Sequence, residues 1–334
     1  MARDPRKEIL NRGRRSIQVD LKHPDAAEFV LALVEKADVL FEGNRPGVTE
    51  RLGVGPEACL ARNPALVYGR MTGWGQTGPL AARAGHDINY IGVSGTLAMV
   101  GRAGEGPVPP ANLLGDFGGG LLLALGIVSA VLHAKVTGVG QVVDGNIVDG
   151  TASFLAMHLG FLQTGLTSDE RGTNSYDGGA HYYDAYETKD GRYMAAGSAE
   201  PGFYAAFLKG TGLDPEKYAD QPNGERWPEW KTGVAAVFKT KTQAEWCAIF
   251  DGVDACVTPV YSPLEAPEAP HNKERGTFVT VNGVLQPGAV PRFSATPGAV
   301  RGIGIPGEGG DEALDEWGIG AAAVQTAREQ GLLL

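Results

Sequence analysis

The chain has 334 residues, of which 43% are hydrophobic and 20% charged, a composition typical of a globular protein with a large core. Its net charge of −10 argues against broad binding of nucleic acids or anionic membranes. Three cysteines without a C-x-x-C pair favour free thiols in a reducing cytoplasm. The N-terminus lacks a signal-peptide core, and the apolar run 121–132 is too short to span a bilayer, so it predicts a buried helix. We therefore expect a cytoplasmic protein with no nucleic-acid or membrane partner.

Strands and helices alternate in the first part of the chain. Short apolar or alternating runs predict strands at 16–21, 37–42, 66–71 and 141–144. Helical spacing and helix start signals predict helices at 25–36, 50–52 and 56–63, and two more that begin at about 88 and 116. This alternation predicts an α/β fold with a parallel sheet covered by helices.

The second part of the chain has a different pattern. A helix at 149–164 and a polar linker at 167–179 precede two strands, 182–187 and 193–197, joined by an Asp-Gly turn that is typical of a hairpin. Helices follow from 200, at 227–238, at 242–250 and at 311–317. We expect a large domain at 1–147, a linker helix and loop at 148–180, a small α+β domain at 181–285, and a return segment with a C-terminal helix at 286–334.

Two segments bring together side chains suited to proton transfer. His86 and Asp87 follow Gly85, and Asp116 stands at the head of a glycine-rich turn. One imidazole and one carboxylate suit a reaction that removes a proton from one face of a carbon and returns it to the other, because His titrates near neutral pH and partial burial can raise the pKa of an Asp toward it. A helix N-cap is the alternative role for each Asp. Glu200 directly precedes Pro201 at the expected start of a helix. It is either an N-terminal carboxylate that the helix dipole favours or a group that orients a catalytic imidazole, and the residues leave both roles open.

Other patterns point to a ligand more weakly. Lys22, Arg45 and Arg51 lie at or just beyond the ends of predicted strands, the edge at which open parallel sheets bind ligands. Three cations at this edge suit the binding of phosphates. The alternative is that they belong to an ordinary solvated surface. The glycine clusters lack dinucleotide-binding spacing, the six histidines form no metal-ligand spacing, and no G-x-S-x-G elbow occurs.

Six runs together resemble the α-methylacyl-CoA racemases, a branch of the family III CoA transferases. These runs are 37–48, 70–79, 85–90, 115–120, 138–144 and 254–260, and the similarity extends from about Arg12 to Phe293. The His-Asp pair followed by Ile-Asn-Tyr is typical of the racemase branch. The resemblance implies the family III CoA transferase fold: a Rossmann-like large domain, a small domain, and an interlocked homodimer with each active site between subunits. It also implies an additional strand–turn–helix unit before the position of Met1.

The resemblance assigns roles to individual residues. His86 and Asp116 would be the two acid/base groups, Glu200 would hydrogen-bond His86 across the dimer, and the Asp87 N–H is suited to bind the thioester oxygen. The CoA moiety would contact Val19, Asp20, Leu21, Lys22, Gly43, Asn44, Arg45, Arg51, Gly85, Ile88, Asn89 and Tyr90. The expected reaction is racemisation at C2 of 2-methylacyl-CoA thioesters through an enolate. It needs no metal or redox cofactor, since CoA is part of the substrate. A CoA transferase with Asp116 as nucleophile and an inactive relative remain the alternatives.

Overall fold

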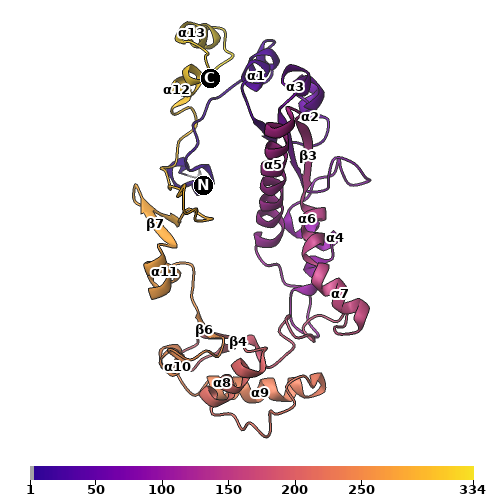
Figure 1. Ribbon diagram of the computed structural model, residues 1–334, viewed down its shortest axis with the longest axis vertical. Coiled ribbons are helices and arrows are strands. Elements are labelled where there is room, and N and C mark those ends of the chain that lie inside the picture. The colour runs from indigo at the N-terminus through magenta and orange to yellow at the C-terminus, as the bar shows by residue number, and fades with distance from the viewer. Residues whose placement is uncertain (1–3) are drawn as a thin grey trace. The chain divides into compact units, whose positions relative to one another are not determined.

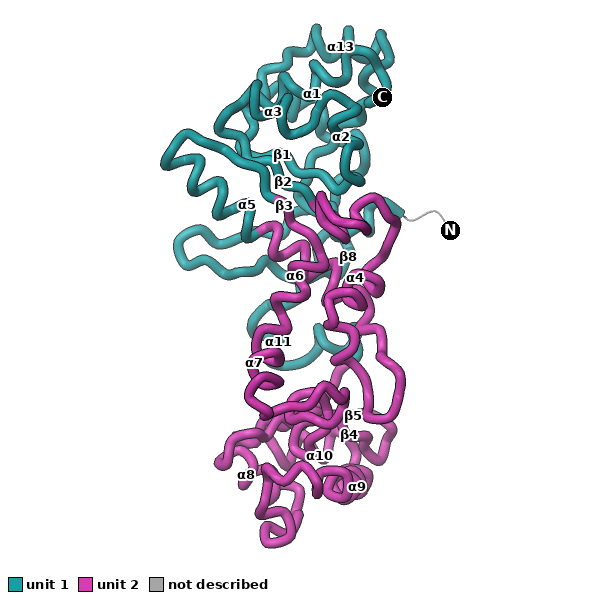
Figure 2. Tube along the Cα trace, turned by 90° about the vertical axis from the view of Figure 1, so that its right-hand side faces the viewer, with its two compact units in different colours: residues 1–70, 125–143, 262–334 teal, residues 71–124, 144–261 magenta. Residues whose placement is uncertain are grey.

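The computed structural model describes residues 4–334, which divide into two compact units (Figures 1 and 2). Unit 1 contains the chain up to Arg70 together with Leu125–Val143 and Ser262–Leu334, and unit 2 contains Met71–Ala124 and Asp144–Tyr261. The α/β class predicted from the sequence is confirmed, whereas the predicted domain limits at 147, 180 and 285 stay predictions.

A three-stranded sheet has most of its residues in unit 1. Its order is β1 (Val39–Glu42), β2 (Val67–Thr72) and β3 (Gln141–Asn146), which confirms three of the predicted strands. β1 and β2 pair in parallel, with Glu42 opposite Arg70. Helices pack on both faces of the sheet, and the central strand β2 is buried from Val67 to Arg70, whereas β1 and β3 are partly exposed. One face packs against α1 (Ala26–Val34) and α3 (Pro56–Arg62), and the other packs against α5 (Gly118–Thr137).

Helix α5 is buried on one face only, so the prediction of a buried helix is wrong for its other face. Ala130 and Ala134 pack on the sheet beside Val67. The opposite face exposes a stripe of apolar side chains, Leu121, Leu125, Val128, Leu132 and Val136. Within residues 4–334, the stretch Leu113–Thr137 is the one that is long and apolar enough to cross a membrane, a criterion that core helices of soluble proteins also meet.

The predicted strand at 16–21 is wrong. Within it, Val19 forms only an isolated bridge with Leu333. Ile17 and Val19 pack in an apolar cluster with α12 (Gly310–Glu316) and α13 (Ala321–Glu329). The alternation of apolar residues therefore reflects packing on helices, because within residues 4–334 no neighbouring strand extends the bridge into a ladder.

The C-terminal part of unit 1 contains elements that the sequence patterns did not predict. They are α11 (Pro270–Arg275), the hairpin of β7 (Phe278–Val281) and β8 (Val284–Pro287), and α13, while α12 confirms the predicted helix at 311–317. Short helices at Pro5–Lys7, Ile9–Asn11, Val48–Arg51 (α2) and Ala266–Glu268 complete this unit.

Unit 2 contains an antiparallel sheet backed by helices. Strands β4 (Tyr183–Glu187) and β5 (Tyr193–Gly197) form the predicted hairpin, and β6 (Val257–Val260) adds to β5. Helices α8 (Pro201–Thr211), α9 (Trp227–Phe238) and α10 (Gln243–Phe250) follow the predicted ranges and pack an aromatic core on one face of the sheet. His181 lies in this core, where burial lowers its pKa to about 4, so the imidazole is neutral near pH 7 and serves packing.

The remaining elements of unit 2 position the candidate site. They are α4 (Asp87–Val93), short turns at Thr96–Met99 and Gly224–Arg226, a π-helical turn at Leu113–Phe117, α6 (Ile147–Phe154) and α7 (Ala156–Thr164). The predicted helix at 149–164 is therefore two helices, separated at Leu155. Helix α4, the π-helical turn and α6 pack against one another, and this packing brings the His86 and Asp116 segments together.

Candidate active site

His86 directly precedes α4, and its neighbours hold its backbone. The His86 N–H donates to Oδ1 of Asn89 at 3.0 Å, and the Tyr90 hydroxyl donates to the Gly85 carbonyl. The Tyr90 ring occupies the space that a side chain at Gly73 or Gly85 would need, since a Cβ on Gly73 would lie 2.0 Å from the ring. The imidazole itself is exposed. Asn89 and Tyr90, both predicted to contact CoA, therefore also fix the chain on either side of His86.

Asp116 lies in the π-helical turn that leads into α5. Its side chain is exposed, and its Oδ2 accepts a hydrogen bond from Nδ2 of Asn112 at 3.3 Å. The sequence patterns did not single out Asn112. The available signal was its position four residues before Asp116, where two side chains on a helical turn can meet.

The Asp87 carboxylate connects the two segments. It is buried, and its Oδ2 accepts the N–H of Asp116 at 2.8 Å. Gly115 leaves the room for this contact, because a Cβ there would lie 2.4 Å from Oδ2 of Asp87. The sequence-based interpretation used only the Asp87 N–H. The N-cap alternative is wrong for Asp87, because His86 is the N-cap of α4 and the Asp87 carboxylate accepts an amide from another segment.

Glu200 stands at the N-cap of α8, three residues after β5 ends. Its carboxylate is exposed and makes no capping hydrogen bond to the helix. Among residues 4–334, no hydrogen bond or ion pair joins Glu200 to His86 within one chain. The geometry thus leaves this carboxylate accessible.

In unit 1, the residues predicted to bind CoA lie in two segments that are partly exposed, although Val19 packs in the apolar cluster with α12 and α13. Asp20 shapes the turn at 19–22, with its Oδ1 accepting the Lys22 N–H at 3.0 Å. The second segment runs from Gly43 to Arg51, and it exposes the side chains of Asn44, Arg45 and Arg51. Gly47, with a φ of +81°, makes the turn that leads into α2. Both segments therefore present cations to solvent, as phosphate binding requires.

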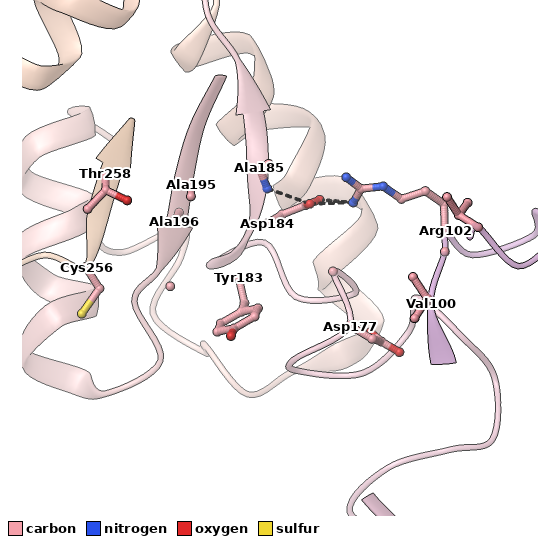
Figure 3. Close-up of a pocket in the computed structure, with 14 residues that line it drawn as sticks. Val100, Arg102, Asp177, Tyr183, Asp184, Ala185, Ala195, Ala196, Cys256 and Thr258 are labelled. Atoms are coloured by element: carbon pink, nitrogen blue, oxygen red, sulfur yellow. Dashed lines mark hydrogen bonds and ion pairs between the residues drawn. The ribbon is translucent and has the colours of Figure 1, made fainter. Parts of the chain in front are cut away.

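Unit 2 also contains a cavity of about 620 Å³ on the open face of its antiparallel sheet (Figure 3). Most of its lining is small or apolar: Val100, Gly101, Val108, Tyr183, Ala185, Ala195, Ala196, Gly197, Cys256 and Thr258. Figure 3 shows Arg102 pointing toward Asp184, and the pair is joined at 2.6 Å. Lys231 also binds this nearly buried carboxylate, at 2.7 Å. Because most of the lining is apolar and both cations are bound to the Asp184 carboxylate, the cavity suits an apolar group.

The chain belongs to CoA-transferase family III, whose sequence profile matches residues 5–312. Within this family it is 47% identical to the α-methylacyl-CoA racemase of Mus musculus over 316 residues, covering 93% of this chain and 83% of that protein. It is 44% identical to the α-methylacyl-CoA racemase of Homo sapiens over 321 residues, covering 93% and 82%.

Known structures agree on the fold. A CAIB/BAIF family protein from Brucella suis superposes with a TM-score of 0.79 at 25% identity, covering 92% of this chain and 82% of that one. Transferases are more distant in sequence: the succinyl-CoA–L-malate CoA-transferase alpha subunit of Chloroflexus aurantiacus is 29% identical, covering 88% of this chain and 71% of that protein.

Proposed function

We propose that this protein is an isomerase that interconverts the two C2 epimers of 2-methylacyl-CoA thioesters. The observation that carries the proposal is the hydrogen bond from the Asp116 N–H to the Asp87 carboxylate, which couples the His86 segment to the Asp116 segment. The 44–47% identity to two racemases over 93% of the chain supports the same reaction.

The two exposed groups divide the proton transfers between them. In one direction neutral His86 takes the C2 proton, the electron pair moves into the thioester as an enolate, and protonated Asp116 delivers a proton to the opposite face. In the other direction the Asp116 carboxylate takes the proton and the imidazolium returns one. Because only a proton moves, the reaction needs no redox cofactor or metal.

The proposed roles of the remaining residues follow from where they stand. The Asp87 N–H is the first amide of α4, a group without an acceptor inside the helix, and it is assigned to the enolate oxygen. Residues 19–22, 43–45 and 51, together with 85–90, are assigned to the CoA moiety. An accessible Glu200 carboxylate is assigned to His86 of a second subunit.

A homodimer, interlocked as the family resemblance implies, is part of this proposal. The exposed apolar stripe on α5 supports it, since five large apolar side chains on one helix face favour burial against a partner. We assign the protein to the cytoplasm, because its net charge of −10 and free thiols suit a reducing, soluble environment.

The test is deuterium uptake at C2. The (R) and (S) forms of a 2-methylacyl-CoA are incubated separately with the purified protein in D₂O and followed by NMR and chiral analysis. We expect uptake from both forms with loss of optical purity. Absence of uptake from folded protein contradicts the proposal. If hydroxylamine then traps an acyl adduct on Asp116, the protein is a CoA transferase that passes through an acyl anhydride.

Gly115 offers a sharp test of the Asp87 contact. We expect Gly115→Ala to lower kcat for C2 exchange on the order of 10- to 100-fold, because the new methyl group displaces the Asp87 carboxylate and with it Asp116. Gly120→Ala is the matched control, since its Cβ would meet nothing within 4 Å. The control is expected to keep full activity. Equal kcat values in both variants would show that the contact does not position Asp116.

A further inference from the structure

Arg70 stands in β2, directly opposite Glu42 at the end of β1. Its side chain is nearly buried, at 8% exposure, and that of Glu42 is 7% exposed. Nε of Arg70 donates to Oε1 of Glu42 at 3.0 Å, and Nη1 donates to Oε1 of Glu50 at 2.7 Å. One guanidinium therefore binds two carboxylates that are eight positions apart in the chain.

The segment between those carboxylates contains Gly43, Asn44 and Arg45, which are assigned to CoA, and Arg51 follows it. Residues 43–51, which include the short helix α2, are called the loop 43–51. Glu42 ends β1 immediately before Gly43, and Glu50 lies in α2 immediately before Arg51. The second oxygen of Glu42 accepts the N–H of Asn44 at 2.5 Å, so the ion pair also holds the loop backbone. Arg70 thus fixes both ends of the loop 43–51.

The charges of this cluster require an arginine at position 70. The cluster of Arg70, Glu42 and Glu50 carries one positive and two negative charges, and the Arg70 hydrogen bonds hold the pKa of Glu50 below its usual range. Without the guanidinium, a buried carboxylate is left unpaired, and two negative charges stand at the base of a loop that must receive phosphates. Only a planar, forked donor bridges both carboxylates.

We propose that Arg70 is a positioning residue that holds the loop 43–51 in the shape that binds the phosphate-bearing part of CoA. The inference rests on the proposed function in that it takes CoA as the ligand of this loop. Arg70 acts through Glu42 and Glu50 and touches neither the reacting carbon nor the acid/base groups. It therefore governs substrate affinity and leaves the chemical step unchanged.

The matched control is Arg62, another arginine of unit 1 that binds two carboxylates. It pairs with Glu28 at 2.7 Å and Glu35 at 2.6 Å, but those residues lie on α1 and just beyond its end, away from the loop. Arg70→Met and Arg62→Met are compared with the wild type. Arg70→Lys is included because it keeps the charge and is expected to fold even where Arg70→Met does not.

Three measurements test the proposal. For Arg70→Met we expect the Kd of CoA, from calorimetric titration, and the KM of the acyl-CoA to rise roughly tenfold or more, with kcat near the wild-type value. Arg70→Lys is expected to show a smaller rise, and Arg62→Met none. Hydrogen–deuterium exchange of the amides at 43–51 is expected to quicken in both Arg70 variants only.

Each outcome has a separate meaning. Unchanged Kd and KM in both Arg70 variants overturn the inference, and so does a loss confined to kcat. If the wild type binds no CoA, the assignment of CoA to the loop 43–51, which belongs to the proposed function, is contradicted. Amide exchange at 43–51 then still shows whether Arg70 holds the loop, and unchanged exchange in the Arg70 variants overturns that part as well.

Discussion

Asp116→Asn is expected to lower racemisation about 10²- to 10⁴-fold, and His86→Ala by a similar factor, because each variant lacks one of two acid/base groups. The losses are expected to differ in kind. With Asp116 removed, His86 still exchanges the C2 proton of the epimer that it faces, so deuterium enters without inversion. With His86 removed, exchange survives only for the other epimer.

The measurement follows deuterium content and optical purity together, starting from each epimer. Asp169→Asn serves as the control, since Asp169 is an exposed carboxylate of unit 2 outside the candidate site. Variants of His86 and Asp116 that racemise at the wild-type rate would show that the two-base assignment is wrong. Equal loss of exchange from both epimers in one variant would point instead to a single base.

Co-expression of two impaired variants, His86→Ala and Glu200→Ala, is expected to restore activity. In a mixed dimer, one site combines the intact His86 of one subunit with the intact Glu200 of the other. Half of the dimers are mixed and each has one such site, so activity is expected to return to about a quarter of the wild-type value for a symmetric dimer. The accessible Glu200 carboxylate, unbonded to His86 within its own chain, motivates this expectation.

Differently tagged subunits allow the mixed dimer to be purified before the assay. If Glu200 acted on His86 of its own chain, every site in the mixed dimer would lack one group and no activity would return. Purified mixed dimers without recovered activity therefore contradict the cross-subunit assignment. A protein that sediments as a monomer contradicts the dimer itself.

Local patterns predicted most of the elements around the candidate site. Short apolar runs marked β1, β2 and β3, and parts of these runs pack against helices, while the Asp-Gly turn correctly marked the hairpin of β4 and β5. The patterns failed where packing decides. The alternation at 16–21 arises from packing on α12 and α13, and β6 is a four-residue strand containing Pro259, whose strand state depends on pairing with β5.

The sequence by itself determined the family, most of the elements around the candidate site and the candidate acid/base residues, because these depend on residue type and on spacing along the chain. Only the tertiary structure decided how those residues are held. The Asp87–Asp116 bond joins residues 29 positions apart, and Arg70 reaches carboxylates 28 and 20 positions away. Such contacts form when distant segments pack together, and the burial that makes them strong exists only after the chain has folded.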